Sequence, residues 1–144
     1  DISKVALSLA EKDWINNGLD PNRHSIIESD VFEFVRKQTS TFDCVIVDPP
    51  AFAKQKKDIP SAFKAYKDIF RESSKLVRPG GLFWVFSCSH YFDTERFQEV
   101  VWTSLLESGR EGSVFEHLGA HWDHPYNINH PEGTYLKGLL LGLS

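Results

Sequence analysis

Residues 42–52 read F-D-C-V-I-V-D-P-P-A-F, and this stretch is the strongest indication of the fold class of the chain. Val45, Ile46 and Val47 form an apolar, β-branched run, which predicts a short strand buried on both faces of a parallel sheet. Asp48 follows at its carboxyl end, and the next two residues are prolines, which lack the backbone N–H that a ladder needs. Because ligands bind outside the carboxyl ends of strands in open α/β sheets, Asp48 is interpreted either as a site residue or as a turn cap.

The composition indicates one compact domain over residues 1–144, since 144 residues that are 41% hydrophobic can form a core. A net charge of −4 excludes a global attraction to nucleic acid, so any contact with a polyanion would be local. No apolar run approaches the roughly 20 residues that span a bilayer. The two cysteines are typical of a reduced, cytoplasmic protein. The chain has no methionine and opens directly into a helix pattern, so we interpret it as part of a longer protein.

Helix and strand patterns alternate along the chain. Helices are expected at residues 3–17, 31–37 and 62–76 and from residue 93 or 94 onward, and strands at residues 25–28, 42–47, 82–86, 113–118 and 135–142. This order predicts an α/β, Rossmann-like doubly wound sheet that is mostly parallel. The last two strands should pair antiparallel, because no helix separates them. The first strand and the glycine-rich turn of such a sheet are missing from the pattern, since Gly80 and Gly81 end a helix and precede a strand.

Five motifs occur in order: D-I-S at 1–3, S-D-V-F at 29–32, D-P-P-A-F at 48–52, S-C-S-H at 87–90 and Y-L-K-G at 135–138. Together they resemble class I S-adenosylmethionine-dependent methyltransferases of the large-subunit rRNA methyltransferase I type, which methylate carbon 5 of a cytosine in 23S rRNA. The resemblance implies a cytoplasmic RNA methyltransferase with S-adenosylmethionine as cofactor, rRNA as partner and neither membrane nor metal. A homodimer of the full-length parent is a further expectation. The family's N-terminal RNA-binding domain and glycine-rich cofactor motif are absent from residues 1–144, so the isolated chain is expected to be inactive and to bind cofactor weakly or not at all.

The resemblance implies catalytic roles for Cys88 and Asp48. A cysteine thiolate adds to carbon 6 of cytosine and so makes carbon 5 nucleophilic, while the carboxyl group supplies a proton at ring nitrogen 3. The alternative for Cys88 is a small buried hydrophobic side chain. Cys44 lies inside the predicted strand and is expected to pack in the core.

The resemblance also implies a cofactor site formed by Asp1, Asp30, Val31 and Asp48. Asp1 would hold the ribose hydroxyls. Asp30 with the backbone of Val31 would hold the adenine, and Asp30 is equally interpreted as a helix N-cap.

The implied substrate site consists of Pro49, Pro50, Phe52 and Lys54. Phe52 either stacks on a target base flipped out of the RNA or packs within its own loop. Lys54 begins a basic run that either contacts RNA phosphates or is a solvated charged segment. Tyr135 and Lys137 match the family motif near the end of the chain and are interpreted as strand residues with a supporting role at most.

Three histidines near the chain end, His117, His121 and His124, are spaced like metal ligands on a helix face, and His130 follows nearby. A glycine and a proline interrupt the helix that such spacing would need, and no cysteine completes a tetrahedral set, so no metal is expected. Three functions therefore remain: a cytosine-5 RNA methyltransferase, an Asp-Pro-Pro enzyme that methylates an exocyclic base amine, and a noncatalytic RNA-binding module.

Overall fold

The computed structural model describes the backbone of residues 1–144 and every side chain except that of residue 131. The chain forms two compact units, residues 1–38 and 39–144, each of which is described by itself. The first unit contains α1 (Lys4–Asn16), η1 (Pro21–Arg23) and α2 (Val31–Lys37). The second contains β1 (Phe42–Val47), η2 (Lys56–Asp58), α3 (Ile59–Ser74), β2 (Val77–Ser87), α4 (Thr94–Ser108), β3 (Gly112–Leu118), η3 (Pro131–Gly133) and β4 (Lys137–Leu143).

Side-chain caps begin both α-helices of the first unit. The hydroxyl of Ser3 accepts a hydrogen bond from the amide of Ala6 at 3.3 Å, and the carboxylate of Asp30 accepts from the amides of Phe32 and Glu33 at 2.9 and 3.1 Å. The strand predicted at residues 25–28 is wrong. The backbone of Asp1 forms hydrogen bonds of 3.1 Å to residues 27 and 29, and one residue is too short to make a ladder.

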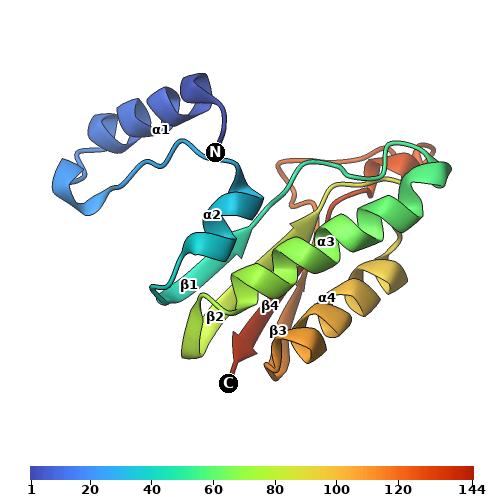
Figure 1. Cartoon of the computed structure of the whole chain (residues 1–144). Helices are drawn as coiled ribbons and strands as arrows, with labels where there is room; N and C mark the ends of the chain where they lie inside the picture. Colours follow the sequence, from blue (N-terminus) through green and yellow to red (C-terminus); the bar gives the residue numbers. More distant parts are fainter. The chain divides into compact units, whose positions relative to one another are not determined.

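The second unit is built on a four-stranded sheet with the order β1-β2-β4-β3 (Figure 1). β1 and β2 pair in parallel, with Ile46 opposite Trp84, as the two apolar runs predicted. β4 is antiparallel to both of its neighbours, which confirms the antiparallel pairing of the last two strands and leaves three strands running the same way. The α/β fold class is therefore confirmed.

Helices α3 and α4 cover one face of this sheet (Figure 1). Phe83 and Val85 of β2 point to this face, and Tyr66 and Phe70 of α3 pack there. All four side chains are fully buried. Burial of such a side chain stabilises the fold by about 1.5–3 kcal/mol. The covered face is therefore the core of the second unit.

The opposite face of the sheet begins at β1 with two exposed side chains, Cys44 and Ile46, the latter 64% exposed. The predictions of a strand buried on both faces and of a core position for Cys44 are therefore wrong. The physical reason is that β1 is an edge strand and that these two side chains alternate with those facing the helices. Further along this face, the ring of Phe115 lies over Gly142, where an added Cβ would come within 2.5 Å of it.

A four-residue bulge in β2 interrupts its pairing with β1. Phe42 lies opposite Val77, but Cys44 lies opposite Leu82, so residues 78–81 bulge out of the ladder. Gly80 provides the left-handed backbone that this turn requires, with φ 75°. The two glycines thus lie within β2, and the prediction that they stop a helix and precede a strand is corrected: α3 has already ended at Ser74.

Replacing Gly81 with alanine is expected to destabilise the chain by about 1–3 kcal/mol, because the new methyl group would overpack the bulge. Its Cβ would lie 2.9 Å from the carbonyl oxygens of Arg78 and Asp43, and neither backbone atom can easily move. Urea unfolding measures the change. Gly119→Ala is the matched control and should change stability by less than about 0.5 kcal/mol, since the nearest atom to its Cβ is 3.7 Å away. Equal stability of the two variants would contradict this account of the bulge.

Candidate active site

The motifs that follow β1 and β2 lie at the same edge of the sheet, because the two strands are parallel neighbours. The Sγ atom of Cys88 lies 3.9 Å from the carbonyl oxygen of Pro49, so the thiol contacts the Asp-Pro-Pro segment directly. The Cys88 side chain is half-buried, while Asp48 is exposed. A partly accessible sulfur and an accessible carboxyl group therefore share one end of the sheet.

A buried hydroxyl cluster, formed by Ser87, Tyr66 and Ser89, holds this end of the sheet together. The Ser87 hydroxyl donates to the Tyr66 hydroxyl at 2.9 Å, and the Tyr66 and Ser89 hydroxyls lie 2.7 Å apart. The Ser89 hydroxyl also accepts from the amide of Ala53 at 3.1 Å. The cluster thus ties α3, the end of β2 and the loop after β1 into one unit, with Cys88 between its two serines.

The loop after β1 contains the predicted substrate residues. Pro49 is buried, whereas Pro50 and Lys54 are exposed. The ring of Phe52 is half-buried and packs against that of Tyr66, with centroids 4.7 Å apart and planes at 58°. Packing within the fold is thus observed for Phe52, and contact of these residues with a base stays a prediction.

Lys137 is the residue at this edge whose importance the sequence prediction underestimated. Its side chain is buried, with 8% exposed, and its ammonium group donates to the carbonyl oxygens of Ser89 and Tyr135 at 3.0 and 2.6 Å. Burial lowers the pKa of Lys137, and an electrostatic interaction with Cys88 opposes this change. A sequence signal did exist, because Lys137 is the one charged residue in a strand that otherwise reads G-L-L-L-G-L.

The predicted cofactor residues fall in both units: Asp1, Asp30 and Val31 in the first and Asp48 in the second. One carboxylate oxygen of Asp30 caps α2, which confirms the N-cap interpretation. Its other oxygen has no hydrogen-bond partner among the described residues and can accept from an amine. The Asp1 carboxylate accepts from the amide of Ser3 at 2.7 Å. The carboxylate oxygens of Asp1 and Asp30 are hydrogen-bond acceptors, which fits the hydroxyl and amino groups of a nucleoside.

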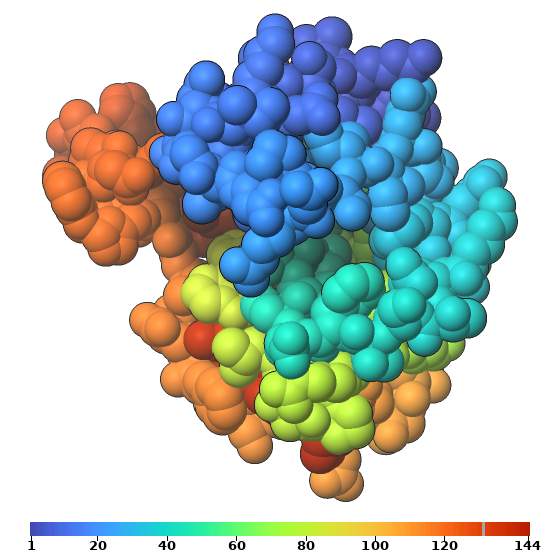
Figure 2. Space-filling view, turned by 90° about the vertical axis from the view of Figure 1, so that its left-hand side faces the viewer, coloured from blue at the N-terminus to red at the C-terminus, as the bar shows by residue number. Residues whose placement is uncertain are grey.

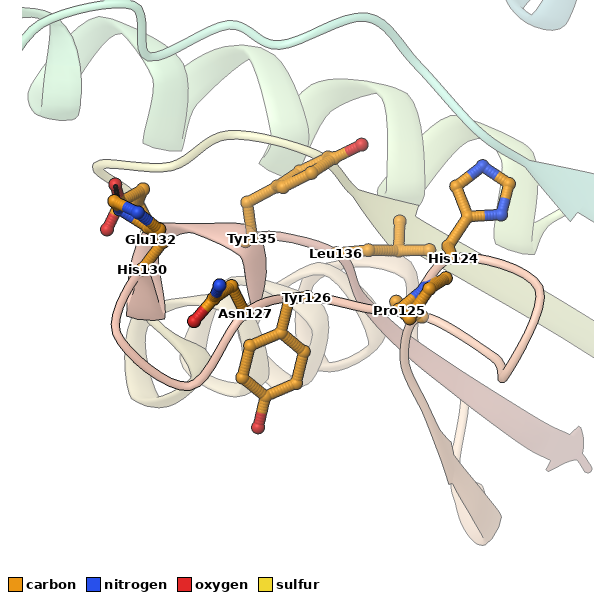
Figure 3. Close-up of a pocket in the computed structure, with 10 residues that line it drawn as sticks. His124, Pro125, Tyr126, Asn127, His130, Glu132, Tyr135 and Leu136 are labelled. Carbon is orange, nitrogen blue, oxygen red and sulfur yellow. Dashed lines mark ion pairs between the residues drawn. The ribbon is translucent and has the colours of Figure 1, made fainter.

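A pocket of about 300 Å³ lies in the long loop between β3 and β4 (Figure 3). Tyr126 and Tyr135 line it, and in this view their rings point to opposite sides of the loop backbone. Gly133 lies so close to Tyr126 that an added Cβ would approach its Cβ to 2.5 Å. Figure 2 shows the loop, in orange, projecting from the body of the second unit. Its Trp122 side chain is 82% exposed.

The histidines of this region make weak contacts. His130 lies 3.4 Å from Glu132, and His117 lies 3.4 Å from Gln98. Within the part of the chain whose side chains are described, no group of three or more His, Cys, Asp or Glu residues is arranged to hold a metal ion. Among the described helices, none has the length and apolar character needed to cross a membrane.

Residues 1–106 match the model of the methyltransferase small domain family. The chain belongs to this family. Its Asp48 and Cys88 thus belong to a methyltransferase domain.

Curated relatives of this methyltransferase domain are more specific in name. It is 38% identical over 143 residues to ribosomal RNA large subunit methyltransferase I of Shewanella amazonensis and 37% identical over 144 residues to that of Aeromonas salmonicida. These alignments cover 97% and 98% of the chain but 36% of each relative, so the chain spans about a third of their length.

Solved methyltransferase structures share the fold. The crystal structure of a methyltransferase complexed with SAH matches with a TM-score of 0.80 at 21% identity, covering 99% of this chain and 37% of that one. An S-adenosylmethionine-dependent methyltransferase from Clostridium acetobutylicum matches with a TM-score of 0.61 at 12% identity, covering 99% of this chain and 72% of that one. The methyltransferase fold is therefore established for the chain.

Tyr66→Phe is expected to lower the free energy of unfolding by about 1–2 kcal/mol, because it leaves the buried Ser87 hydroxyl without its acceptor. Hydrogen exchange at the Ala53 amide should accelerate as well, since this amide is bonded to the same cluster. Tyr126→Phe removes a hydroxyl from a tyrosine that is 50% exposed and should change neither quantity. Unchanged stability and exchange in Tyr66→Phe would mean that the hydroxyl cluster does not hold the loop.

Proposed function

We infer that this chain is a catalytic segment of an RNA methyltransferase that transfers a methyl group from S-adenosylmethionine to carbon 5 of a cytosine in 23S rRNA. The observation that carries the proposal is the contact between the half-buried Cys88 sulfur and the Asp-Pro-Pro segment at 3.9 Å. The family match and the names of the relatives support the transfer of methyl groups and rRNA as the substrate. Residues 1–144 act in this proposal as one partial catalytic domain of a longer protein, for which a homodimer stays a prediction.

The chemistry of cytosine explains why a thiol belongs at this place. Carbon 5 is too weak a nucleophile to accept a methyl group unaided. The Cys88 thiolate forms a bond from sulfur to carbon 6, and the electron pair of the carbon 5–carbon 6 double bond moves toward carbon 5. Asp48 supplies a proton at ring nitrogen 3, which stabilises the charge of the adduct. Both groups lie at the edge of the sheet where ligands bind in this class of fold.

When it is bound, S-adenosylmethionine supplies a methyl group on a positively charged sulfur, which carbon 5 can attack. Loss of the carbon 5 proton to a water base then restores the double bond as the carbon–sulfur bond breaks and Cys88 leaves as thiolate, and the proton at ring nitrogen 3 returns to Asp48. The residues of the first unit proposed to hold the cofactor are Asp1 at the ribose and Asp30 with Val31 at the adenine, and Asp48 of the second unit is proposed as a further cofactor residue. The unpartnered carboxylate oxygen of Asp30 supports its place as acceptor for the exocyclic amine.

The RNA would be held by two segments of the second unit. The first is the loop beside Cys88, which is shaped by Pro49, Pro50, Phe52 and Lys54. The second is the loop of residues 119–136 between β3 and β4, called the aromatic loop below, which contributes exposed rings. Stacking on aromatic side chains is the usual way in which proteins hold unpaired bases, and a target base must leave the RNA stack before its ring can react. The chain carries a net charge of −4, so stacking and local lysines have to replace a general electrostatic attraction.

In the full-length protein that carries this chain, Cys88→Ala is expected to abolish methyl transfer and to leave cofactor affinity nearly unchanged. The thiolate bonds to the base only along the reaction path, so its loss falls on the chemical step. Asp48→Asn keeps the shape but cannot give a proton and should slow transfer by about 10²–10⁴-fold. Single-turnover methylation and calorimetric cofactor titration measure the two effects. Cys44→Ala is the control and should methylate at the normal rate, because Cys44 is exposed and lies within β1 rather than at its end.

The same assay separates this function from its alternatives. A Cys88→Ala variant that retains a near-normal rate while Asp48→Asn is inactive would replace the cysteine mechanism with methylation of an exocyclic amine. A full-length protein that binds rRNA but methylates none of its bases would instead support a noncatalytic RNA-binding module.

Trp122→Ala is expected to weaken RNA binding about fivefold or more, because loss of one base–aromatic stack costs about 1–3 kcal/mol. Trp122 is 82% exposed on the aromatic loop, and Trp102, 65% exposed on α4, offers a matched control of the same residue type. Fluorescence anisotropy with an rRNA fragment measures both affinities. Equal losses in Trp122→Ala and Trp102→Ala would contradict a specific role for the loop.

A further inference from the structure

Among the residues whose side chains are described, none offers a carboxylate partner to the buried ammonium group of Lys137. Burial of a cation is costly unless an anion or several acceptors compensate for the lost water. Two of the three ammonium N–H groups have acceptors, the carbonyl oxygens of Ser89 and Tyr135 at 3.0 and 2.6 Å. The third has no acceptor among the described residues, and no ion pair joins Lys137 to Asp or Glu in that part of the chain.

The backbone places this ammonium group beside the turn that carries Cys88, since it is bonded to the carbonyl oxygen of the next residue, Ser89, at 3.0 Å. Lys137 is the first residue of β4 and lies directly opposite Ser87, the last residue of β2, in the antiparallel pair. From there its side chain reaches the carbonyl group of Ser89, so it spans the Cys88 position that lies between the two serines. The titratable groups of the segments that meet at this end of the sheet are Cys88 and His90 after β2, Asp48 after β1, and Tyr66 of α3, whose hydroxyl is bonded to that of Ser89. An electrostatic interaction with Cys88 raises the pKa of Lys137, against the lowering by burial.

We propose that Lys137 is a positioning residue for the nucleophile: its ammonium group stabilises Cys88 as a thiolate at the carboxyl end of β2. The inference rests on the proposed function and names the group that activates its sulfur. Cys88 gives its proton to water, and the negative charge that remains on sulfur is balanced by Lys137. When sulfur bonds to carbon 6 this charge passes to the base, and it returns beside Lys137 when the carbon–sulfur bond breaks.

The Ser89 carbonyl group gives the arrangement its rigidity. It accepts from the ammonium group of Lys137 and, at 3.2 Å, from the backbone amide of Phe92. The Phe92 residue is fully buried. The ammonium group is therefore held by the same turn that carries Cys88, and a lysine that moved with solvent could not keep its charge beside the sulfur. A charge–charge interaction in such a partly dry site is stronger than one at the surface.

The test measures the reactivity of Cys88 rather than methylation, so that it does not depend on the proposed function. In the full-length protein with Cys44→Ala, which removes the exposed second thiol of this chain, Cys88 is alkylated with iodoacetamide across a range of pH and quantified by peptide mass spectrometry. Lys137→Gln is expected to slow alkylation at pH 7 about tenfold or more and to move the half-maximal rate to higher pH, because an opposite charge at close range favours a thiolate by that order. Lys137→Arg keeps the charge and should restore much of the rate. An unchanged pH profile in folded Lys137→Gln overturns the proposal.

A second measurement covers the case in which Lys137→Gln does not fold. In the protein with both cysteines, the ratio of rates for anionic iodoacetate and neutral iodoacetamide should be several-fold higher at Cys88 than at Cys44, because the two reagents differ mainly in charge. Equal ratios at the two thiols overturn the proposal. Failure of the methylation mechanism has a different signature, since Cys88→Ala would then methylate normally whatever the alkylation profile shows.

Discussion

The hydrogen bonds among Ser87, Tyr66 and Ser89 are the constraint on which the arrangement of the candidate site depends. Their hydroxyl groups are buried and lie 2.7–2.9 Å apart, so each satisfies a polar group that would otherwise be costly to bury. They join the middle of α3 to the end of β2 and, through the amide of Ala53, to the loop after β1, segments that are far apart in the sequence. Because both serines are fixed, the thiol between them has a defined position next to the Asp-Pro-Pro segment.

Much of this fold could be predicted from residue patterns. The apolar runs at 45–47 and 82–86 each end in a polar motif, and parallel strands bring such ends to one edge, so the placement of the Asp-Pro-Pro segment and Cys88 at one edge of the sheet followed from pattern alone. Asp30 before an apolar run was recognisable as a helix cap. The antiparallel pairing of β3 with β4 followed from the missing helix between them.

The remaining features depend on tertiary partners that a pattern cannot give. Cys44 and Ile46 have the composition of core residues, but they lie on an edge strand and point away from α3 and α4. Residues 25–28 have strand propensity, yet the structure assigns no strand there, and Asp1 bonds to residues 27 and 29 as a single residue. The hydroxyl of Tyr66 looks incidental on an apolar helix face until Ser87 and Ser89 are placed beside it. The sequence marks Lys137 only as a strand residue, since its burial and its hydrogen bond to the carbonyl group of Ser89 depend on the tertiary structure.

The mechanism requires a covalent bond between Cys88 and the target base, and trapping of that bond is its direct test. An rRNA fragment with 5-fluorocytosine at the target position is incubated with the full-length protein and S-adenosylmethionine, because fluorine at carbon 5 prevents the proton loss that releases the thiolate. If Cys88 is the nucleophile, a stable protein–RNA adduct forms. Its cross-linked peptide, identified by mass spectrometry, contains residue 88. Methylation of unmodified RNA without any trapped adduct, or an adduct at Cys44, would contradict it.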